Sequence, residues 1–482
     1  MATHTAAHRN LAWLLGLACF LSFVYFYEGG GWNQNSRFDL LRAIVERHTL
    51  RIDAYHENTG DKAESNGHYY SDKAPGVVFL ALPFAVAARE GMRAAGLDPE
   101  SARGEYLLSY IVTAGGVALP TALAGVCLFF LALRFGAGVG GAALSVVVMA
   151  IGTPLLAYAS LFWAHALVGA CFVFAFAAAV KLEDGAREFW WALAVGVAAG
   201  WATVTEYPAA PISALLAVFA LMQVWDRGRA SRWRVVAGVG FGGAFCAAVL
   251  FGYLYAAFGS LRPSYSHYGP NSFGFMQHQG YLGLTYPHPD RLLKLLFGCS
   301  RGLLAASPVL AGAVAGLVLM WKRFRGAGFV VAAIATYYFL FNASFYWWKA
   351  GLTFGPRYAG GCIPLLCLGL AVAWTRAPVG WQWVLVVLAC VSVFITIMVV
   401  STSSQLAMQD SCPIVHSSWP AFWSGQMATN RESMLLAGEA VGGFSAFNLG
   451  QVMGLHGLGS LGPLLGMWGI VGGMAARILQ RQ

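Results

Sequence analysis

The feature that most constrains this chain is a series of apolar runs, each about as long as a helix that crosses a membrane. Only 11% of its 482 residues are charged, against about 25% in soluble proteins. This composition excludes a water-soluble enzyme and a disordered protein, and it predicts an all-α polytopic membrane protein with about 12 spans. The predicted spans are residues 11–27, 105–133, 139–157, 162–180, 190–206, 208–224, 235–258, 303–321, 327–343, 359–375, 380–400 and 458–476.

Two segments near the start of the chain need separate interpretation. The first apolar run, Leu11 to Tyr27, follows a basic residue at Arg9 and has no small-residue cleavage site behind it, which is typical of a signal anchor. A further apolar segment, 74–88, contains Pro75 and Pro83 and lies between two positions predicted on the same side. We expect it to dip into the membrane or to lie at its interface; if it spans, the count becomes about 13.

The basic loops predict the orientation. The segments 226–234 and 321–325 are rich in Arg and Lys and are therefore predicted to be cytoplasmic. Counting spans from them places every long polar segment on the outer face, where function is expected. We divide the chain into a transmembrane module, residues 1–400, and residues 401–482, which hold an outer segment and the last transmembrane helix. The long outer segments are 28–73, about 259–300, 342–358 and 401–457.

Net charge and cysteine content add little about function. The charge of +9 lies largely in short loops, so it indicates topology rather than a nucleic-acid partner. The nine cysteines include no C-x-x-C pair, and most lie inside apolar runs. We expect them to be small core residues, with neither a metal cluster nor a disulfide scaffold.

The first outer loop, residues 28–73, is the most charged part of the chain. Phe38, Leu41 and Val45 recur at helical spacing, which predicts an amphipathic helix over 36–48 on the membrane surface. Arg37 would then lie at the level of the lipid headgroups. Further along, the acid–base neighbours Asp61-Lys62 and Asp72-Lys73 stand in non-helical sequence. Such turns can aim a carboxylate and an ammonium into one cavity, although a simply solvated loop remains an alternative.

Several short motifs, taken in order, resemble a known family. The first loop contains an Arg-aromatic pair and then an aromatic-x-x-Lys-x-Pro turn before the dipping segment. With the later motifs, the sequence resembles the GT-C glycosyltransferases over about residues 10–400. Within that fold it is similar to the branch of the protein O-mannosyltransferases and the lipid A aminoarabinose transferase, including uncharacterised bacterial members. The motifs are Arg37-Phe38-Asp39, Tyr70-Ser71-Asp72-Lys73-Ala74-Pro75, Gly152-Thr153-Pro154-Leu155 with Tyr158, Ser300-Arg301-Gly302-Leu303-Leu304 and Phe354-Gly355-Pro356-Arg357-Tyr358.

The resemblance implies a GT-C fold in the bacterial cytoplasmic membrane, with the active site facing outward. It implies a polyprenyl-phosphate-linked sugar as donor and a lipid, glycan or protein as acceptor. A carboxylate would deprotonate the acceptor, and cations would stabilise the leaving phosphate. The chemistry requires no metal, and a divalent metal at His288-Pro289-Asp290 lacks a third ligand fixed by spacing.

The resemblance also assigns roles to residues. Lys73 matches the lysine that meets the carrier phosphate, Arg37 matches the arginine that opens the first surface helix, and Lys62 and Arg357 are further phosphate-binding candidates. In relatives an Asp stands a few residues before that arginine, but here those positions read Asn33-Gln34-Asn35-Ser36. The base therefore stays open among Asp39, ranked first, Asp61 and Asp53, with Glu28 behind them.

Aromatic residues of the outer segments are candidates for substrate binding. An aromatic belt with snorkelling cations is the alternative interpretation. His165 and Glu206 stand at span ends, where an ionisable group is a functional candidate. The candidates for substrate binding are Tyr70, His267, Tyr268, Trp348 and Tyr358.

Two other functions remain open at this point. A transporter or flippase is disfavoured because the charges lie in an outer loop rather than at midplane and inverted repeats are missing. A non-catalytic subunit that binds a lipid carrier is kept open by the missing Asp before Arg37.

Overall fold

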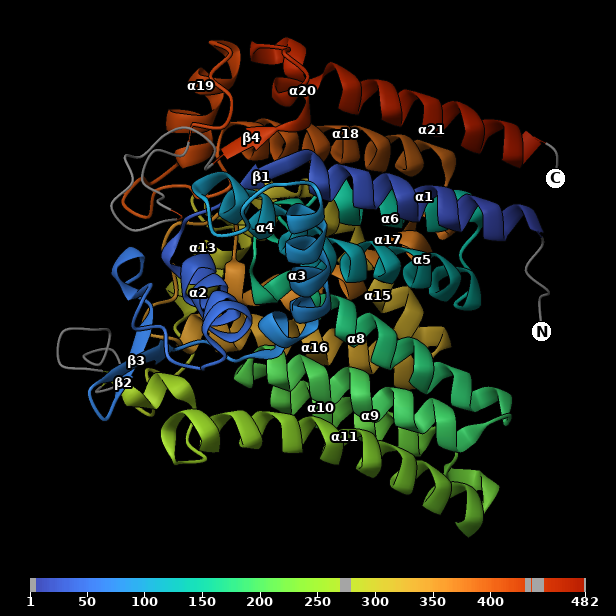
Figure 1. Ribbon diagram of the computed structural model, residues 1–482. Coiled ribbons are helices and arrows are strands. Elements are labelled where there is room, and N and C mark those ends of the chain that lie inside the picture. The colour runs from blue at the N-terminus through green and yellow to red at the C-terminus, as the bar shows by residue number, and fades with distance from the viewer. Residues whose placement is uncertain (1–5, 269–278, 430–434, 436–445, 481–482) are drawn as a thin grey trace.

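The computed structural model describes residues 6–268, 279–429, 435 and 446–480. It is a bundle of helices with two small two-stranded sheets among these residues (Figure 1). Nine helical segments of the described chain are long and apolar enough to cross a membrane, which confirms a polytopic membrane protein. They are Ala6–Tyr25, Ala102–Arg134, Ala164–Asp184, Tyr207–Arg227, Arg229–Phe258, Arg325–Ser344, Arg357–Arg376, Val379–Thr402 and Gly457–Ile478.

Of the three remaining predicted spans, 190–206 forms one continuous helix, Glu188–Thr205, and the other two are interrupted. The run 139–157 breaks at Gly152 to Pro154, and the run 303–321 breaks at Ser307-Pro308, because proline cannot continue the hydrogen-bond ladder of a helix. The helices are α1 (Ala6–Tyr25), α2 (Trp32–Arg47), α3 (Gly76–Ala94), α4 (Ala102–Thr113), α5 (Leu119–Arg134), α6 (Val139–Ile151), α7 (Leu155–Ala159), α8 (Ala164–Lys181), α9 (Glu188–Thr205), α10 (Ala210–Met222), α11 (Arg229–Phe258), α13 (Pro289–Phe297), α14 (Leu303–Ala306), α15 (Ala311–Arg323), α16 (Arg325–Ser344), α17 (Ile363–Arg376), α18 (Val379–Thr402), α19 (Trp419–Trp423), α20 (Leu449–Val452) and α21 (Gly462–Gln480).

Glycine allows the closest helix contacts of the bundle. A Cβ added to Gly316 of α15 would collide with the backbone of Gly369 in α17. One added to Gly242 of α11 would collide with the backbone of α9 near Leu193 and Val197. Small residues therefore let these backbones meet, as expected of membrane helices.

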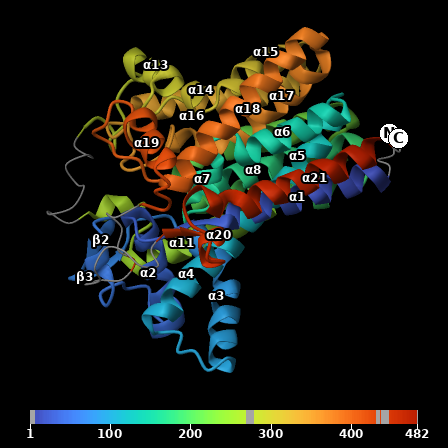
Figure 2. The ribbon, with the colours of Figure 1, turned by 90° about the horizontal axis from the view of Figure 1, so that it is seen from above.

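The predicted inner and outer loops lie at opposite ends of the bundle. Both chain ends lie at one end, whereas α2, β2, β3, α13 and α19 lie at the other (Figures 1 and 2). The inner loops contact one another: Arg134 pairs with Glu183 at 3.0 Å, and Arg227 donates to the Leu182 carbonyl at 2.6 Å. The ring of Phe135 also contacts that of Phe324 in the second basic loop, so the two basic loops share one end, as the sequence predicts. We call the opposite end the outer end, because it carries the predicted outer loops.

Labelling of single cysteines would show which end faces the cytoplasm. We expect Ser65→Cys, in the hairpin at the outer end, to react with a membrane-impermeant maleimide in intact cells. Gly228→Cys should react only after the membrane is opened. The reverse pattern would overturn the orientation. Asn271, which the sequence also predicts to be outside, lies beyond the described residues.

The first outer loop folds into a helix, a hairpin and a second helix. Strands β2 (Lys62–Ser65) and β3 (His68–Ser71) pair antiparallel, and the turn residues Asn66 and Gly67 both have positive φ, as a two-residue hairpin turn requires. Helix α3, which carries Pro83, runs across the direction of α1 in both views (Figures 1 and 2). This crossing agrees with a segment lying at the interface.

Helix α2 begins earlier than predicted and is not a simple surface helix. Residues 34–41 are buried, polar side chains included, and Arg37 is only 3% exposed. Arg37 is therefore covered by protein rather than presented to lipid headgroups on the face of a surface helix. Other parts of the protein cover it, because the outer segments fold over α2.

Residues from the C-terminal part complete the outer end. Strand β1 (Phe26–Glu28) pairs antiparallel with β4 (Ala446–Asn448), and α21 packs along α1, where Trp468 donates to Ser22 at 2.9 Å. Cys299 and Cys412 form a disulfide, so the expectation that the cysteines are small core residues is wrong for these two. The two cysteines are 113 residues apart, and only folding brings their segments together.

Candidate functional site

Charged side chains from six parts of the chain meet at the outer end. The turn between β3 and α3 provides Asp72 and Lys73, and Asp61 comes from just before β2. Arg37 comes from α2 and Arg357 from the start of a 3-10 helix, Arg357–Cys362. His165 opens α8, and Glu206 follows the last residue of α9. We call these seven residues the outer cluster.

Lys73 is held between two carboxylates. Its Nζ lies 2.8 Å from Oδ2 of Asp61 and 2.9 Å from Oδ2 of Asp72. Burial alone would lower the pKa of Lys73, but the charges of Asp61 and Asp72 outweigh burial and raise it. The ammonium is therefore firmly charged, although most of its side chain is covered.

Asp72 is fully buried and well satisfied. Its Oδ1 accepts from Ser36 at 3.1 Å, its Oδ2 accepts from the Tyr268 hydroxyl at 2.8 Å, and its backbone carbonyl accepts from Ser264 at 2.7 Å. Burial raises the pKa of Asp72, and Lys73 opposes that shift. These contacts tie the β3–α3 turn to α2 and to the segment around Ser264, so Asp72 fixes the position of Lys73.

Two arginines of the outer cluster each have one N–H donor without a hydrogen-bond partner among the described residues. Arg37 donates to Asn33, and Arg357 stacks over the Trp163 ring at 4.8 Å. The Nε atoms of both arginines are buried and have no hydrogen-bond partner among the described residues. Burial lowers the pKa of Arg37 to about 10, with the charges of Glu206 and Asp72 opposing. A buried donor without an acceptor is costly, so an anion between these arginines would stabilise both.

His165 and Glu206 form a second charged pair of the outer cluster. Nδ1 of His165 lies 3.0 Å from Oε1 of Glu206, and His165 is 2% exposed. The rings of Trp163 and Tyr358 contact the imidazole edge to face. Neither Nδ1 nor Nε2 of His165 has a hydrogen-bond partner in the part of the chain that the structure describes, so the contact with Glu206 is a close ion-pair distance rather than a formed hydrogen bond.

Of the predicted carboxylates, only Asp61 reaches the outer cluster. Asp39 is buried elsewhere on α2, where Asn58 donates to it at 3.2 Å. Asp53 is largely exposed and pairs with His68 at 2.8 Å. Glu28 is buried in another place, where the backbone amide of Ser404 donates to it at 2.6 Å.

The other predicted residues divide in the same way. Arg37, Lys73 and Arg357 meet in the outer cluster, whereas Lys62 bonds to His56 at 3.0 Å on the hairpin. Tyr268 contacts the outer cluster through Asp72, and Tyr358 through His165. The remaining aromatics pack apart from it: Tyr70 and His267 contact Phe258, and Trp348 lies near Lys294 and Lys349.

The structure brings in three residues that the sequence did not place in the site. Asp72 stood in a recognised acid–base pair, and His165 and Glu206 stood at span ends. These positions in the sequence mark them as candidates. The spacing of residues along the chain does not show that helices α8 and α9 place His165 beside Glu206.

Asp39 offers a test by pH. Burial raises the pKa of its carboxyl well above the usual value, with Asn58 and Arg42 opposing. A raised folded-state pKa lowers stability progressively as the pH rises above the unfolded value of about 4, because the unfolded chain then releases a proton that the folded chain keeps. We expect Asp39→Asn to lose less thermal stability than wild type between about pH 5 and pH 8. If the thermal stability of Asp39→Asn depends on pH as that of wild type does, the pKa of Asp39 is not raised in the folded protein.

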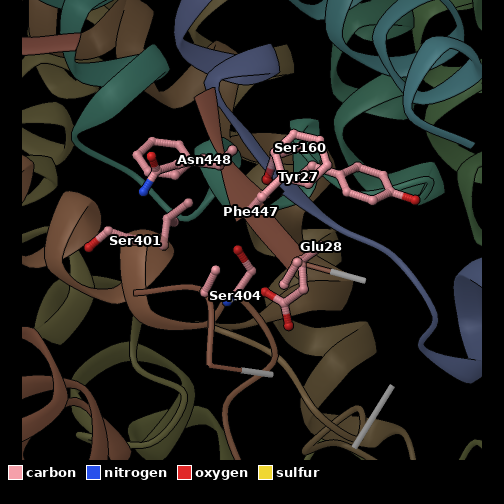
Figure 3. A pocket seen from close by; sticks show the side chains of 11 residues that line it. Tyr27, Glu28, Ser160, Ser401, Ser404, Phe447 and Asn448 are labelled. Carbon is pink, nitrogen blue, oxygen red and sulfur yellow. Dashed lines mark hydrogen bonds between the residues drawn. The ribbon is translucent and has the colours of Figure 1, made fainter. Parts of the chain in front are cut away.

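A small cavity lies beside Glu28, at the junction of β1, β4 and the end of α18 (Figure 3). No residue of the outer cluster lines it. Hydrogen bonds from Ser403 and Gln405, each 3.1 Å, also reach the Glu28 carboxylate. Glu28 is thus bound into the junction of the first and last parts of the chain.

The described residues contain no group of three or more His, Cys, Asp or Glu side chains placed to hold a metal ion. His288 contacts Thr285, and Asp290 pairs with Lys294 at 3.1 Å. These two side chains, which the sequence disfavours as a metal site, are thus engaged in other contacts.

No protein-family model and no curated protein matches the sequence. The chain is similar to solved structures of ArnT from Cupriavidus metallidurans. The match to the form bound to undecaprenyl phosphate has 16% identity and a TM-score of 0.49, over 82% of this chain and 65% of that one. The chain is also similar to the Archaeoglobus fulgidus oligosaccharyltransferase in the apo form, with 11% identity and a TM-score of 0.48, over 81% of this chain and 55% of that one. It spans less than two thirds of the length of both proteins.

Proposed function

We propose that the protein is a GT-C-type membrane glycosyltransferase. It moves a sugar from a polyprenyl phosphate carrier to a lipid, glycan or protein acceptor on the outer face of a bacterial cytoplasmic membrane. The observation that carries this proposal is the pair of buried arginines, Arg37 and Arg357, whose Nε donors lack partners among the described residues. Phosphate oxygens are strong acceptors for such donors.

The rest of the outer cluster suits transfer from a phosphate. The leaving phosphate gains negative charge as the bond to the sugar breaks, and Arg37, Arg357 and Lys73 supply fixed positive charge for it. A carboxylate must take the proton of the acceptor hydroxyl, and of the predicted outer-loop candidates only Asp61 lies in the outer cluster. Cations of the chain supply the stabilisation, so we propose that the reaction needs no divalent metal.

The disulfide supports the outer location of the site. Cys299 and Cys412 belong to the two segments 259–300 and 401–457, both predicted to lie outside. Disulfides persist in oxidising compartments such as the periplasm and are rare in the cytosol. The end of the bundle that carries the outer cluster is therefore proposed to face the periplasm.

One observation favours a second candidate function. Arg37 bonds to the neutral side chain of Asn33 rather than to a carboxylate preceding it. If transfer needs the carboxylate that relatives carry before this arginine, the protein binds the carrier without catalysing transfer.

A transfer assay separates the two functions. The purified protein in lipid nanodiscs is mixed with radiolabelled polyprenyl phosphate hexoses and pentoses and with lipid, glycan and protein acceptors. We expect label from one donor to appear in one acceptor class. Carrier binding with all label retained on the carrier would support the binding subunit, and absence of binding would reject both functions.

A further inference from the structure

Two carboxylates of the outer cluster could take the proton, and their surroundings differ. Asp72 is excluded because it is fully buried and its oxygens already bond to Ser36, Lys73 and Tyr268. The side chains of Asp61 and Glu206 remain partly accessible, at 13% and 17%. They come from the hairpin and from the end of α9, so they approach the cluster on separate elements.

Asp61 is poorly suited to accept a proton. Its carboxylate lies 2.8 Å from the Lys73 ammonium. Protonation of Asp61 would break this direct ion pair with a permanent cation. Removing the Asp61 charge would also release Lys73, so the pair is better understood as a device that positions the ammonium.

Glu206 has a different neighbour. Its ion-pair partner among the described residues is His165, an imidazole rather than a permanent cation. Both ring nitrogens of His165 are without a hydrogen-bond partner among the described residues, but Nδ1 lies only 3.0 Å from Oε1 of Glu206. An Nδ1 that carries the proton would donate to Glu206 and orient the carboxylate, and Nε2 would then be an acceptor. Arg37 and Arg357 also act on Glu206 through their charges, which places the carboxylate beside the proposed phosphate site.

Resting on the proposed function, we infer that Glu206 is the carboxylate that deprotonates the acceptor, with His165 as its positioning residue. The acceptor O–H bond breaks and its proton moves to Glu206. The acceptor oxygen forms a bond to the anomeric carbon of the sugar. The bond from that carbon to the phosphate oxygen breaks, and its electron pair leaves with the phosphate. Asp61 keeps Lys73 in place during this step.

The test compares Glu206→Gln with Asp61→Asn in nanodiscs, using undecaprenyl phosphate as the binding probe and the labelled donor found by the transfer assay. We expect Glu206→Gln to bind the probe within about threefold of wild type and to lose about 10²- to 10⁴-fold in kcat. Asp61→Asn should lose mainly probe affinity. Glu188→Gln is the matched control, because Glu188 is a buried glutamate at the opposite end of the same helix α9.

The alternative is that Glu206 only balances the charge of Arg37 and Arg357. In that case Glu206→Gln would change probe affinity and leave kcat near wild type, which would overturn the inference. Loss of kcat in Asp61→Asn with Glu206→Gln active would overturn it as well. If wild type transfers no sugar, the proposed function fails too, so the two failures are distinguishable.

The pH profile of kcat tests His165. The groups whose charges act on Glu206 are His165, Arg37 and Arg357. Without the imidazole donor, the carboxylate should protonate more readily, so His165→Phe should move the acidic limb of the profile to higher pH. His165→Gln keeps a donor and should restore part of the shift. An unmoved acidic limb in His165→Phe would remove His165 from the positioning role.

Discussion

Replacing both Arg37 and Arg357 by alanine is expected to weaken binding of undecaprenyl phosphate by about 10²- to 10⁴-fold. Each arginine would lose a hydrogen bond to a charged group, worth about 1.5–3 kcal/mol, and each 1.4 kcal/mol corresponds to a factor of about ten in affinity. Arg37→Ala alone should cost about 10- to 150-fold. Binding is measured in nanodiscs with a labelled carrier.

Arg93→Ala is the control for this pair, because Arg93 is exposed on α3 and pairs with Glu90 on the same helix. It should bind the carrier as wild type does. Thermal unfolding in the same nanodiscs shows whether the double variant is folded. Unchanged affinity in a folded double variant would remove the arginines from the phosphate site and, with them, the observation on which the function rests.

Lys73→Ala is expected to destabilise the fold by about 3–5 kcal/mol, the usual cost of leaving a buried charge without its partner. Asp72 is fully buried and Asp61 is largely covered, so neither carboxylate can recover its hydration. Stability is measured by unfolding in mixed micelles. Adding Asp72→Asn should recover part of the loss.

Lys294→Ala provides the comparison for Lys73. Lys294 and Asp290 form an exposed ion pair along α13, which is worth at most about 1 kcal/mol. If Lys73→Ala loses no more stability than Lys294→Ala, then Asp61 and Asp72 are not buried charges that depend on Lys73, which would contradict the structure of this site.

The sequence alone predicts the apolar runs that form the nine long helical segments, and it singles out the three cations that meet in the outer cluster. Apolar runs are visible without an alignment because the membrane requires their length. Arg37, Lys73 and Arg357 stand in recognisable motifs of the outer segments. Pro154 and Pro308, which break two of the apolar runs, are also visible in the sequence. How far they shorten the helices depends on how the bundle packs around them.

Which carboxylate lies beside these cations was harder to predict because closeness along a chain is not closeness in space. Asp39 was ranked first because it stands two residues from Arg37, yet residues two apart on a helix do not face each other. Lys62 directly follows Asp61, but neighbouring residues of an extended segment point to opposite sides. In the structure Asp61 pairs with Lys73 and Lys62 turns toward His56.

Contacts between segments that are far apart in the chain could not be predicted from the sequence. Glu206 and His165 belong to different helices, and the Cys299–Cys412 disulfide joins segments 113 residues apart. Such pairs depend on how α8 packs against α9 and how the outer segments fold over the bundle. Hydropathy and spacing carry no information on either.

A structure of the protein with undecaprenyl phosphate bound tests the central claim most directly. The account predicts phosphate oxygens at hydrogen-bond distance, about 2.7–3.2 Å, from Nε of both Arg37 and Arg357, with Lys73 alongside and Glu206 facing the place of the sugar. A phosphate bound elsewhere, such as in the cavity beside Glu28, with both Nε donors still without partners, would contradict it.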